Sequence, residues 1–209
     1  MKRREMKNFK KIVAGLLVVM LLVPQEAWAA SQWTWDGTAG THSIRLNNIN
    51  NVATGDYSVA MGNKSTASAA FATAMGTDTI ASQWASTAMG EHTTASGSRS
   101  TAMGIWSEAS DYASTAMGDT TKASGSRSTA MGDHTIASAY AATAMGYHTE
   151  ARGNSSTTMG DHTKASGVYS IATGVYSQAI GRGSFAGGGT GDADELKGGK
   201  AYGDSSFAF

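Results

Sequence analysis

The chain has no cysteine, and after its first thirty residues it has few of the large aliphatic side chains that usually build a core. Without cysteine it can form neither disulfides nor thiolate metal sites. Gly, Ala, Ser and Thr dominate the rest of the sequence, and these side chains gain little free energy on burial. A conventional globular core is therefore excluded, and stability has to come from backbone pairing and from another kind of packing.

Basic clusters are also missing beyond the N-terminus. Residues 1–29 carry six of the 16 Lys and Arg residues and two of the 16 Asp and Glu residues, so ten basic and 14 acidic residues remain, a net charge of −4. Proteins that bind phosphate backbones draw on clustered Lys and Arg. Nucleic acid is therefore excluded as a partner.

The signatures of common enzymes are absent too. The sequence has no GxSxG and no HExxH motif, and the glycines of residues 187–191 lack the GK[ST] ending of a phosphate-binding loop. The Ser, His and Asp residues fall in repeating rows, whereas catalysis needs a unique, enclosed constellation. We predict a protein that is not an enzyme and that uses no cofactor.

The N-terminus has the pattern of an export signal. Six basic residues lie between Lys2 and Lys11, an apolar run extends from Ile12 to Val23, and a small-residue triplet ends at Ala29. A helix that spans a membrane needs about 20 apolar residues, so this run is too short. We predict that residues 1–29 are a signal peptide and that the mature chain leaves the cytoplasm.

The rest of the chain is built from a repeat. A Met-Gly pair recurs with a 14-residue period, and beneath it lies a heptad that reads small hydroxyl, any residue, Ala, any residue, usually Gly. The heptad runs through twenty copies between Asn51 and Gly188, with Thr158 as the only replacement for the Ala. Such regularity is typical of a solenoid. The Met residues of the 14-residue repeat are Met61, Met75, Met89, Met103, Met117, Met131, Met145 and Met159.

The heptad predicts strands. Its first, third and fifth residues are alike while the second and fourth vary, which is the period of two that a strand shows. A coiled coil is excluded, because the heptads lack an apolar a and d pair and are rich in Gly. We expect an all-β, parallel β-roll of 14-residue coils, each with two strands of about five residues, stacked at the strand spacing of about 4.8 Å.

The two halves of each coil differ in what they turn outward. The first half presents Thr and Met, as in Thr87 and Met89, with little variation, whereas the second half presents varied residues such as Glu108 and Lys122. An exposed stripe of eight Met residues would favour aggregation, and each buried Met contributes about 1.5 to 3 kcal/mol. We therefore predict an obligate oligomer joined along the eight Met residues.

At this point the sequence resembles a known family. The segments YSVAMG (residues 57–62) and VYSIATGVYSQAIG (residues 168–181) are similar to the head repeats of YadA-like trimeric autotransporter adhesins, and the resemblance spans residues 51–188. It implies a left-handed parallel β-roll, a homotrimer, and a head that binds a host matrix protein, host cells or other bacteria. It also implies an exported protein at the cell surface or outer membrane of a Gram-negative-type bacterium, or an extracellular one if the chain is complete as given.

The segments on either side of the repeat region depart from the head-repeat pattern. Residues 30–50 hold an apolar cluster that we predict to cap the solenoid; the rival interpretation is a binding site at the tip. In residues 189–209 the register breaks and then resumes as a truncated repeat, so that anchoring to the outer membrane would depend on a C-terminal region absent here. The predicted cap residues are Trp33, Trp35, Ile44, Leu46 and Ile49.

One turn of the coil alternates aromatic and basic side chains. Such a row could bind a matrix or cell-surface ligand, collagen-like or glycan, by stacking and cation–π contact. The alternative is that rings and guanidinium groups stack on one another and shield the roll. The row consists of Trp84, Arg99, Tyr112, Arg127 and Tyr140.

Histidines recur two residues after the repeat Gly, at His92, His134, His148 and His162, with aspartates beside two of them. Imidazole and carboxylate together can hold a divalent metal. A solvent-exposed row lacks the second shell of such sites, so we interpret the histidines as polar turn residues and predict no metal.

Two other classes of function remain. A regular Thr row beside the Met stripe is compatible with an ice-binding or other repetitive-surface-binding solenoid, and a chain of this kind could also be a structural spacer of a surface fibre. An exposed, monomeric Thr and Met face favours the first, whereas a trimer that hides it favours adhesion. The Thr row comprises Thr73, Thr87, Thr101, Thr115, Thr129, Thr143 and Thr157.

Overall fold

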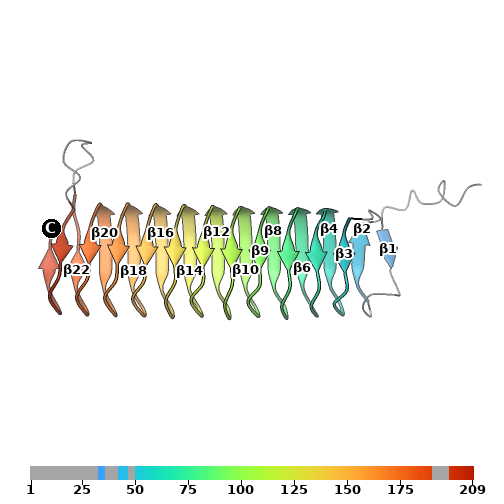
Figure 1. Ribbon diagram of the computed structural model, residues 1–209, viewed down its shortest axis with the longest axis horizontal. Helices are drawn as coiled ribbons and strands as arrows, with labels where there is room; N and C mark the ends of the chain where they lie inside the picture. The colour runs from blue at the N-terminus through green and yellow to red at the C-terminus, as the bar shows by residue number, and fades with distance from the viewer. Residues whose placement is uncertain (1–32, 36–41, 47–49, 190–197) are drawn as a thin grey trace, which may run out of the picture.

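The computed structural model describes residues 33–35, 42–46, 50–189 and 198–209, and in this part the chain winds into a long solenoid (Figure 1). Each coil contributes one strand to each of two sheets, and the coils follow one another along a single axis. The predicted signal peptide, residues 1–29, and Ile49 lie outside the described residues. Helices long and apolar enough to cross a membrane are not found in the part of the chain that is described.

The strands of the described residues form a 13-stranded sheet and an 11-stranded sheet. The long strands of the first sheet are β4 (Val59–Asn63), β6 (Thr73–Thr77), β8 (Thr87–Glu91), β10 (Thr101–Ile105), β12 (Thr115–Asp119), β14 (Thr129–Asp133), β16 (Thr143–Tyr147), β18 (Thr157–Asp161) and β20 (Ile171–Val175). Its end strands are β1 (Trp33–Trp35), β2 (Ile44–Leu46), β22 (Phe185–Ala186) and β24 (Phe207–Ala208).

The second sheet holds the second strand of each coil. Its strands are β3 (Val52–Ala53), β5 (Thr66–Ala67), β7 (Ile80–Ala81), β9 (Thr94–Ala95), β11 (Glu108–Ala109), β13 (Lys122–Ala123), β15 (Ile136–Ala137), β17 (Glu150–Ala151), β19 (Lys164–Ala165), β21 (Gln178–Ala179) and β23 (Lys200–Ala201).

Neighbouring coils pair in parallel, and their register equals the period of the sequence repeat. Met103 pairs with Met117 in the first sheet, and Glu108 pairs with Lys122 in the second. The expected parallel solenoid of 14-residue coils is therefore confirmed. Because register and period coincide, every repeat position becomes a straight row of like side chains along the solenoid.

The strands are less equal than the sequence predicts. Long strands have five residues as expected, but the strands of the second sheet have only two, so the expectation of two five-residue strands in each coil is wrong for the second half. Pairing there continues beyond the strand as single bonds, such as Ser96 N–H to the Ala109 carbonyl at 2.9 Å, while the chain already bends toward the next turn.

The repeat glycines of the first half lie inside the strands rather than in the turns. Gly104 in β10 has φ of 115°, and a Cβ built on it would lie 2.0 Å from the carbonyl oxygen of Gly118 in the next coil. Only glycine permits both that backbone angle and that approach. The turn comes two residues later, where Trp106 has φ of 51°.

The interior is filled by the inward Ala, Ser and Thr of each half-repeat. The Ala rows that include Ala102 and Ala109 are fully buried, and so are hydroxyl residues such as Ser107 and Thr121. Some of these hydroxyls bond along the stack: Thr121 Oγ1 donates to Ser107 Oγ at 2.8 Å, and Ser107 Oγ donates to the Gly118 carbonyl at 3.0 Å. Small side chains are required because the two sheets of one coil lie close together.

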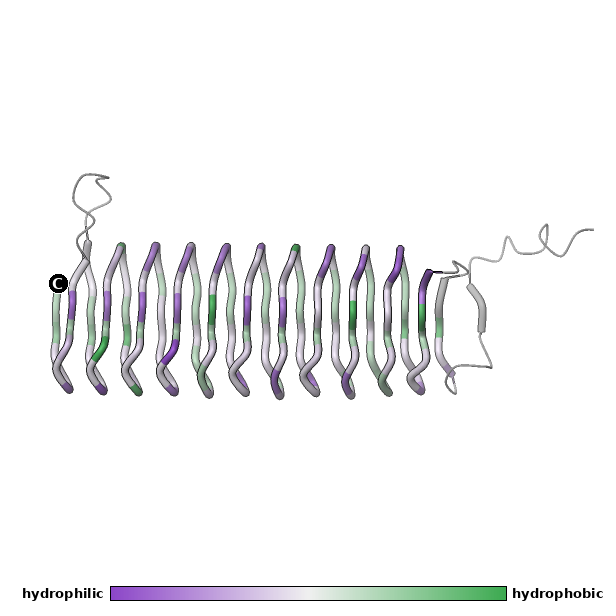
Figure 2. The backbone as a smooth tube through the Cα atoms, in the orientation of Figure 1, coloured by the Kyte–Doolittle hydropathy of each residue, from purple (hydrophilic) through white to green (hydrophobic). Residues whose placement is uncertain are grey.

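Figure 2 shows polar residues at many of the turns and along several strands of the second sheet, whereas the strands of the first sheet are pale or apolar. This distribution follows from the coil, because its turns are its most exposed segments and its strands face either the interior or a flat sheet surface. Candidate binding residues are therefore to be sought in the turn rows and on the outer faces of the two sheets.

The ends of the solenoid keep the sheet pattern with local changes. At the N-terminal end, β1 pairs antiparallel with β2, and β2 pairs in parallel with β4. At the C-terminal end, Phe185 pairs with Phe207, a longer step along the chain that accommodates the extra residues 190–197. The strand after this insertion, β23, pairs with β21. β1 thus forms the edge strand of the first sheet at its N-terminal end.

Candidate binding surfaces

The outer face of the first sheet carries the Thr and Met rows. From Met61 to Met145, each Met of a long strand pairs directly with the Met of the next coil, and seven of the eight Met residues are half-buried in the single chain. Met159 is 42 % exposed. The face therefore presents a continuous, partly exposed apolar stripe along one flat sheet.

The aromatic and basic row follows one turn of each coil, and its members contact one another. The Arg99 guanidinium lies 4.9 Å from the centre of the Trp84 ring and 5.6 Å from that of Tyr112, and its Nη1 donates to Tyr112 Oη at 2.7 Å. Arg127 lies 5.6 Å from the Tyr140 ring and also donates to its hydroxyl. Each basic group thus covers part of the ring beside it.

These five side chains nevertheless reach solvent. Trp84, Tyr112 and Tyr140 are between 38 % and 46 % exposed, and both arginines are exposed. The geometry that the alternative interpretation expected, mutual stacking, therefore occurs on a surface that a ligand can still reach.

The opposite turn carries a second row that is built mainly of rings. His134 stacks on His148 with centroids 4.7 Å apart, His148 stacks on His162 at 4.8 Å, and His162 stacks on Tyr176 at 4.8 Å. Further toward the N-terminus His92 stacks on Trp106 at 4.0 Å. We call the residues at this turn position from His92 to Tyr176 the ring row; they are His92, Trp106, Thr120, His134, His148, His162 and Tyr176.

Every residue of the ring row has a left-handed backbone, with φ between 50° and 54°. This conformation costs a residue other than glycine about 1 to 2 kcal/mol relative to the right-handed region. Stacked rings contribute about 0.5 to 1.5 kcal/mol per pair beyond the area that they bury, which offsets part of that strain. Stacking between coils therefore helps to hold the row in place.

The histidines pair with their neighbours rather than gathering around a common point. His134 Nδ1 contacts Asp133 Oδ1, and His162 Nδ1 contacts Asp161 Oδ1, while the Tyr147 ring lies edge-on to His148 at 4.3 Å. Among the described residues, no group of three or more His, Asp or Glu side chains is arranged to hold a metal ion.

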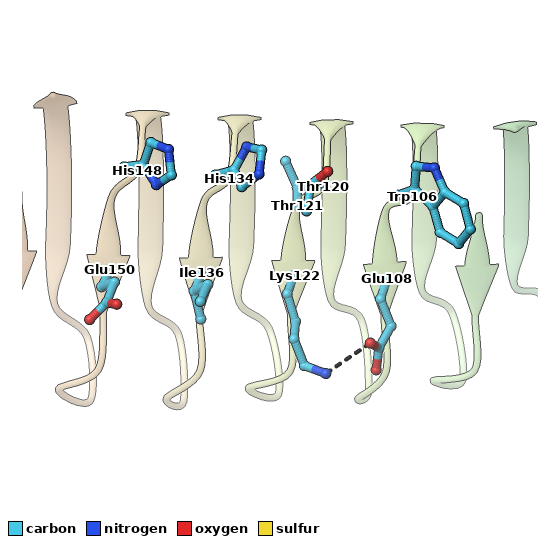
Figure 3. A pocket seen from close by; sticks show the side chains of 9 residues that line it. All are labelled: Trp106, Glu108, Thr120, Thr121, Lys122, His134, Ile136, His148 and Glu150. Atoms are coloured by element: carbon cyan, nitrogen blue, oxygen red, sulfur yellow. Dashed lines mark hydrogen bonds and ion pairs between the residues drawn. The ribbon is translucent and has the colours of Figure 1, made fainter. Parts of the chain in front are cut away.

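A hollow of about 350 Å³ lies between the ring row and the outer face of the second sheet (Figure 3). A second hollow of about 250 Å³ continues it along the solenoid and shares His148 and Glu150 with the first. The first is lined by Trp106, Glu108, Thr120, Thr121, Lys122, His134, Ile136, His148 and Glu150.

The charges beside the hollows are paired within the protein. Lys122 Nζ lies 2.8 Å from Glu108 Oε2, and Glu150 Oε2 lies 2.9 Å from Arg152 Nε and 3.3 Å from Lys164 Nζ. Partial burial raises the pKa of the Glu150 carboxyl, but the hydrogen bonds and charges of Lys164 and Arg152 outweigh burial and hold the pKa below its ordinary value of 4.5. Glu150 is therefore a carboxylate at neutral pH.

Sequence reasoning placed the histidines in a turn row but missed Trp106, Thr120 and Tyr176, which share their position. The signal was present, since all of them lie two residues after the repeat Gly. Trp106 is 60 % exposed, more than any ring of the aromatic and basic row. The prediction considered only the histidines because of their residue type, whereas the ring row is defined by position in the repeat.

Comparison with known proteins agrees with this architecture. Residues 53–79, 85–105, 109–135 and 165–189 match the family described as the YadA head domain repeat. No curated protein matches the chain. The matched repeats and the parallel β-solenoid are features of adhesin-type repeat proteins. Within that class, the chain carries a YadA-like head-repeat region.

Proposed function

We propose that this protein is the head of a trimeric autotransporter adhesin, exported and displayed at the surface of a Gram-negative-type bacterium, where it attaches to host matrix, host cells or other bacteria. In this proposal each subunit is a left-handed roll and residues 1–29 direct export. Residues 30–50 cap the solenoid, and residues 51–188 form the adhesive head.

The Met stripe carries the proposal. An apolar row that continues without a break over eight coils is a surface that soluble monomers rarely expose. Packing the first sheets of three subunits around a common axis would bury it. The aromatic and basic row lies in a turn rather than on this face, so it would stay available to a ligand.

A second function is favoured by one specific observation. The Thr residues from Thr73 to Thr157 pair directly from coil to coil, beside the Met stripe on the same flat face. If the face were exposed in a monomer, this regular hydroxyl row would suit ice or another repetitive surface. The oligomeric state therefore separates the two functions.

The deciding experiment is the molar mass of the purified protein by light scattering, together with its attachment to immobilised matrix proteins. We expect three times the chain mass, unchanged on dilution. Met117→Glu should dissociate the trimer, because it places a charge in the stripe, whereas Ser110→Glu places the same charge on the side of the other sheet and should leave the mass unchanged. A folded monomer that binds ice would overturn the adhesin proposal.

A further inference from the structure

The ring row has one interruption. From His92 to Tyr176, Thr120 is the only member without a ring, and it lies between Trp106 and His134 (Figure 3). Thr120 has the same backbone conformation as its neighbours, with φ of 52° against 51° at both Trp106 and His134. The interruption is therefore one of side chain and not of backbone.

The size of the gap follows from the spacing of the coils. Coils repeat at the strand spacing of about 4.8 Å, so Trp106 and His134, two coils apart, leave roughly 9.6 Å between them along the row. Histidine rings in adjacent coils lie 4.7 and 4.8 Å apart. One additional ring midway would thus stack on both walls at the same separation that the row already uses.

The space over Thr120 is open. It belongs to the hollow of about 350 Å³, and Thr120 itself is exposed. A cavity of about 150 Å³ already accommodates a benzene molecule. The Trp106 ring stacks on His92 of the preceding coil, and Thr120 occupies the same turn position in the following coil.

The surroundings favour a ring without formal charge. Lys122 is paired with Glu108, and Glu150 with Lys164 and Arg152, so both carboxylates that line the hollow already have cationic partners within the protein. Ile136 adds an apolar contact to the lining. Stacking walls with a few polar groups at the side are the composition of sites that hold a flat, largely apolar group.

The hollow is longer than one ring needs. It continues past His148 and Glu150 into the second hollow beside Lys164 and Gln178. From Glu108 to Gln178 the second sheet advances five coils, about 24 Å at the strand spacing. A ligand that fills this length is an extended chain that inserts one ring between Trp106 and His134.

We propose that the gap over Thr120 is a binding slot for one uncharged aromatic side chain, such as tyrosine, on an extended peptide segment of a partner protein. Trp106 and His134 are its walls and Thr120 its floor. The slot would be one of the contacts between the proposed adhesin and its ligand. The inference that a partner protein occupies it rests on the proposed adhesive function. It lies on the side of the second sheet, away from the Met stripe.

The test fills the slot with the ring that the row already uses. Thr120→His places an imidazole where the backbone of four other coils already holds one, so the fold should be retained and the thermal midpoint should rise. Thr120→Ser keeps the slot open and is the matched control. The probe is the blocked tripeptide Gly-Tyr-Gly, and the comparison compounds are Gly-Ala-Gly and p-cresol. Binding is measured as a shift of the fluorine resonance of 5-fluorotryptophan at position 106.

We expect the tyrosine peptide to shift the Trp106 resonance saturably in the parent protein and in Thr120→Ser, with at least tenfold weaker affinity in Thr120→His. Gly-Ala-Gly should produce no shift. Binding by Thr120→His within twofold of the parent protein, or no shift in the parent protein, would overturn the slot. Equal affinity for p-cresol and the tyrosine peptide would overturn the peptide segment as its occupant.

The test of the slot can fail or succeed independently of the test of the adhesin proposal. The probe is bound in solution, so a protein that fails to attach to any matrix can still bind it in the slot. A trimer that attaches equally well with Thr120→His and Thr120→Ser, while its Trp106 resonance never shifts, would keep the adhesin proposal and remove the slot.

Discussion

The imidazole of His148 stacks on that of His162, with the two centroids 4.8 Å apart and the planes at 21° to one another. On its other side His148 stacks on His134 at 4.7 Å. All three residues have left-handed backbones, which stacking between coils helps to stabilise. The ring row is thus a structural element of the solenoid, although none of its residues belongs to a sheet.

His148→Ala should therefore destabilise the protein. It removes two stacked pairs, each of which contributes about 0.5 to 1.5 kcal/mol, so the free energy of unfolding should fall by about 1 to 3 kcal/mol in a urea titration. Ser155→Ala is the control, because Ser155 has φ of 53° in the opposite turn and carries no ring. Equal losses from the two substitutions would mean that stacking contributes nothing.

Gly104→Ala should be far more destabilising than Gly183→Ala. Both glycines have positive φ, 115° and 62°, but a Cβ at Gly104 would lie 2.0 Å from the Gly118 carbonyl oxygen, whereas the nearest atom at Gly183 is 3.8 Å away. The second substitution should cost about 1 kcal/mol for its backbone conformation alone. The first should cost about 3 kcal/mol or more, because neighbouring coils must separate. Similar urea midpoints for the two variants would contradict the close approach of the coils.

Glu150 should make the protein less stable in acid. Its pKa is lowered in the folded state, so the stabilisation is complete above the ordinary value of 4.5 and is lost as the pH falls through the lowered pKa. Glu150→Gln should flatten the dependence of the urea midpoint on pH in the acid range below about pH 5. Lys164→Met should have part of the same effect, since it removes the larger stabilising partner. An unchanged slope in Glu150→Gln would show that other carboxylates dominate acid unfolding.

If the aromatic and basic row binds the ligand, the double variant Arg99→Ala and Arg127→Ala should weaken attachment to matrix while leaving the molar mass unchanged. Exposed cation–π contacts contribute about 0.5 to 1 kcal/mol each, so the fold should tolerate their loss. Arg182→Ala removes an exposed arginine from a turn near the C-terminal end and serves as the control. Undiminished attachment by the double variant would assign the row to shielding of the roll.

Much of the fold could be predicted because the repeat is written directly into the sequence. The 14-residue period determined the coil, and the alternation of Ala with varied residues determined which side chains point inward, as Ala102 and Ala109 do. The unequal lengths of the strands in the two sheets could not be predicted in the same way. Both halves share one heptad, but the bend after Ala109 depends on where the chain must turn to pair with the next coil.

The candidate sites also include some that the sequence could predict and one that it could not. Each row of residues was visible as a period, so the Met stripe and the partners Arg99 and Tyr112 could be named in advance. The gap between Trp106 and His134 could not, because it depends on rings in different coils sharing a stacking direction.

The sequence by itself determined the period, the parallel stacking and the interior of small side chains, because these follow from local patterns repeated many times. Only the tertiary structure decided which turn residues meet as rings and where a ring is missing. Contacts such as that of His148 with His162 join equivalent positions of successive repeats and form only once the coils are stacked.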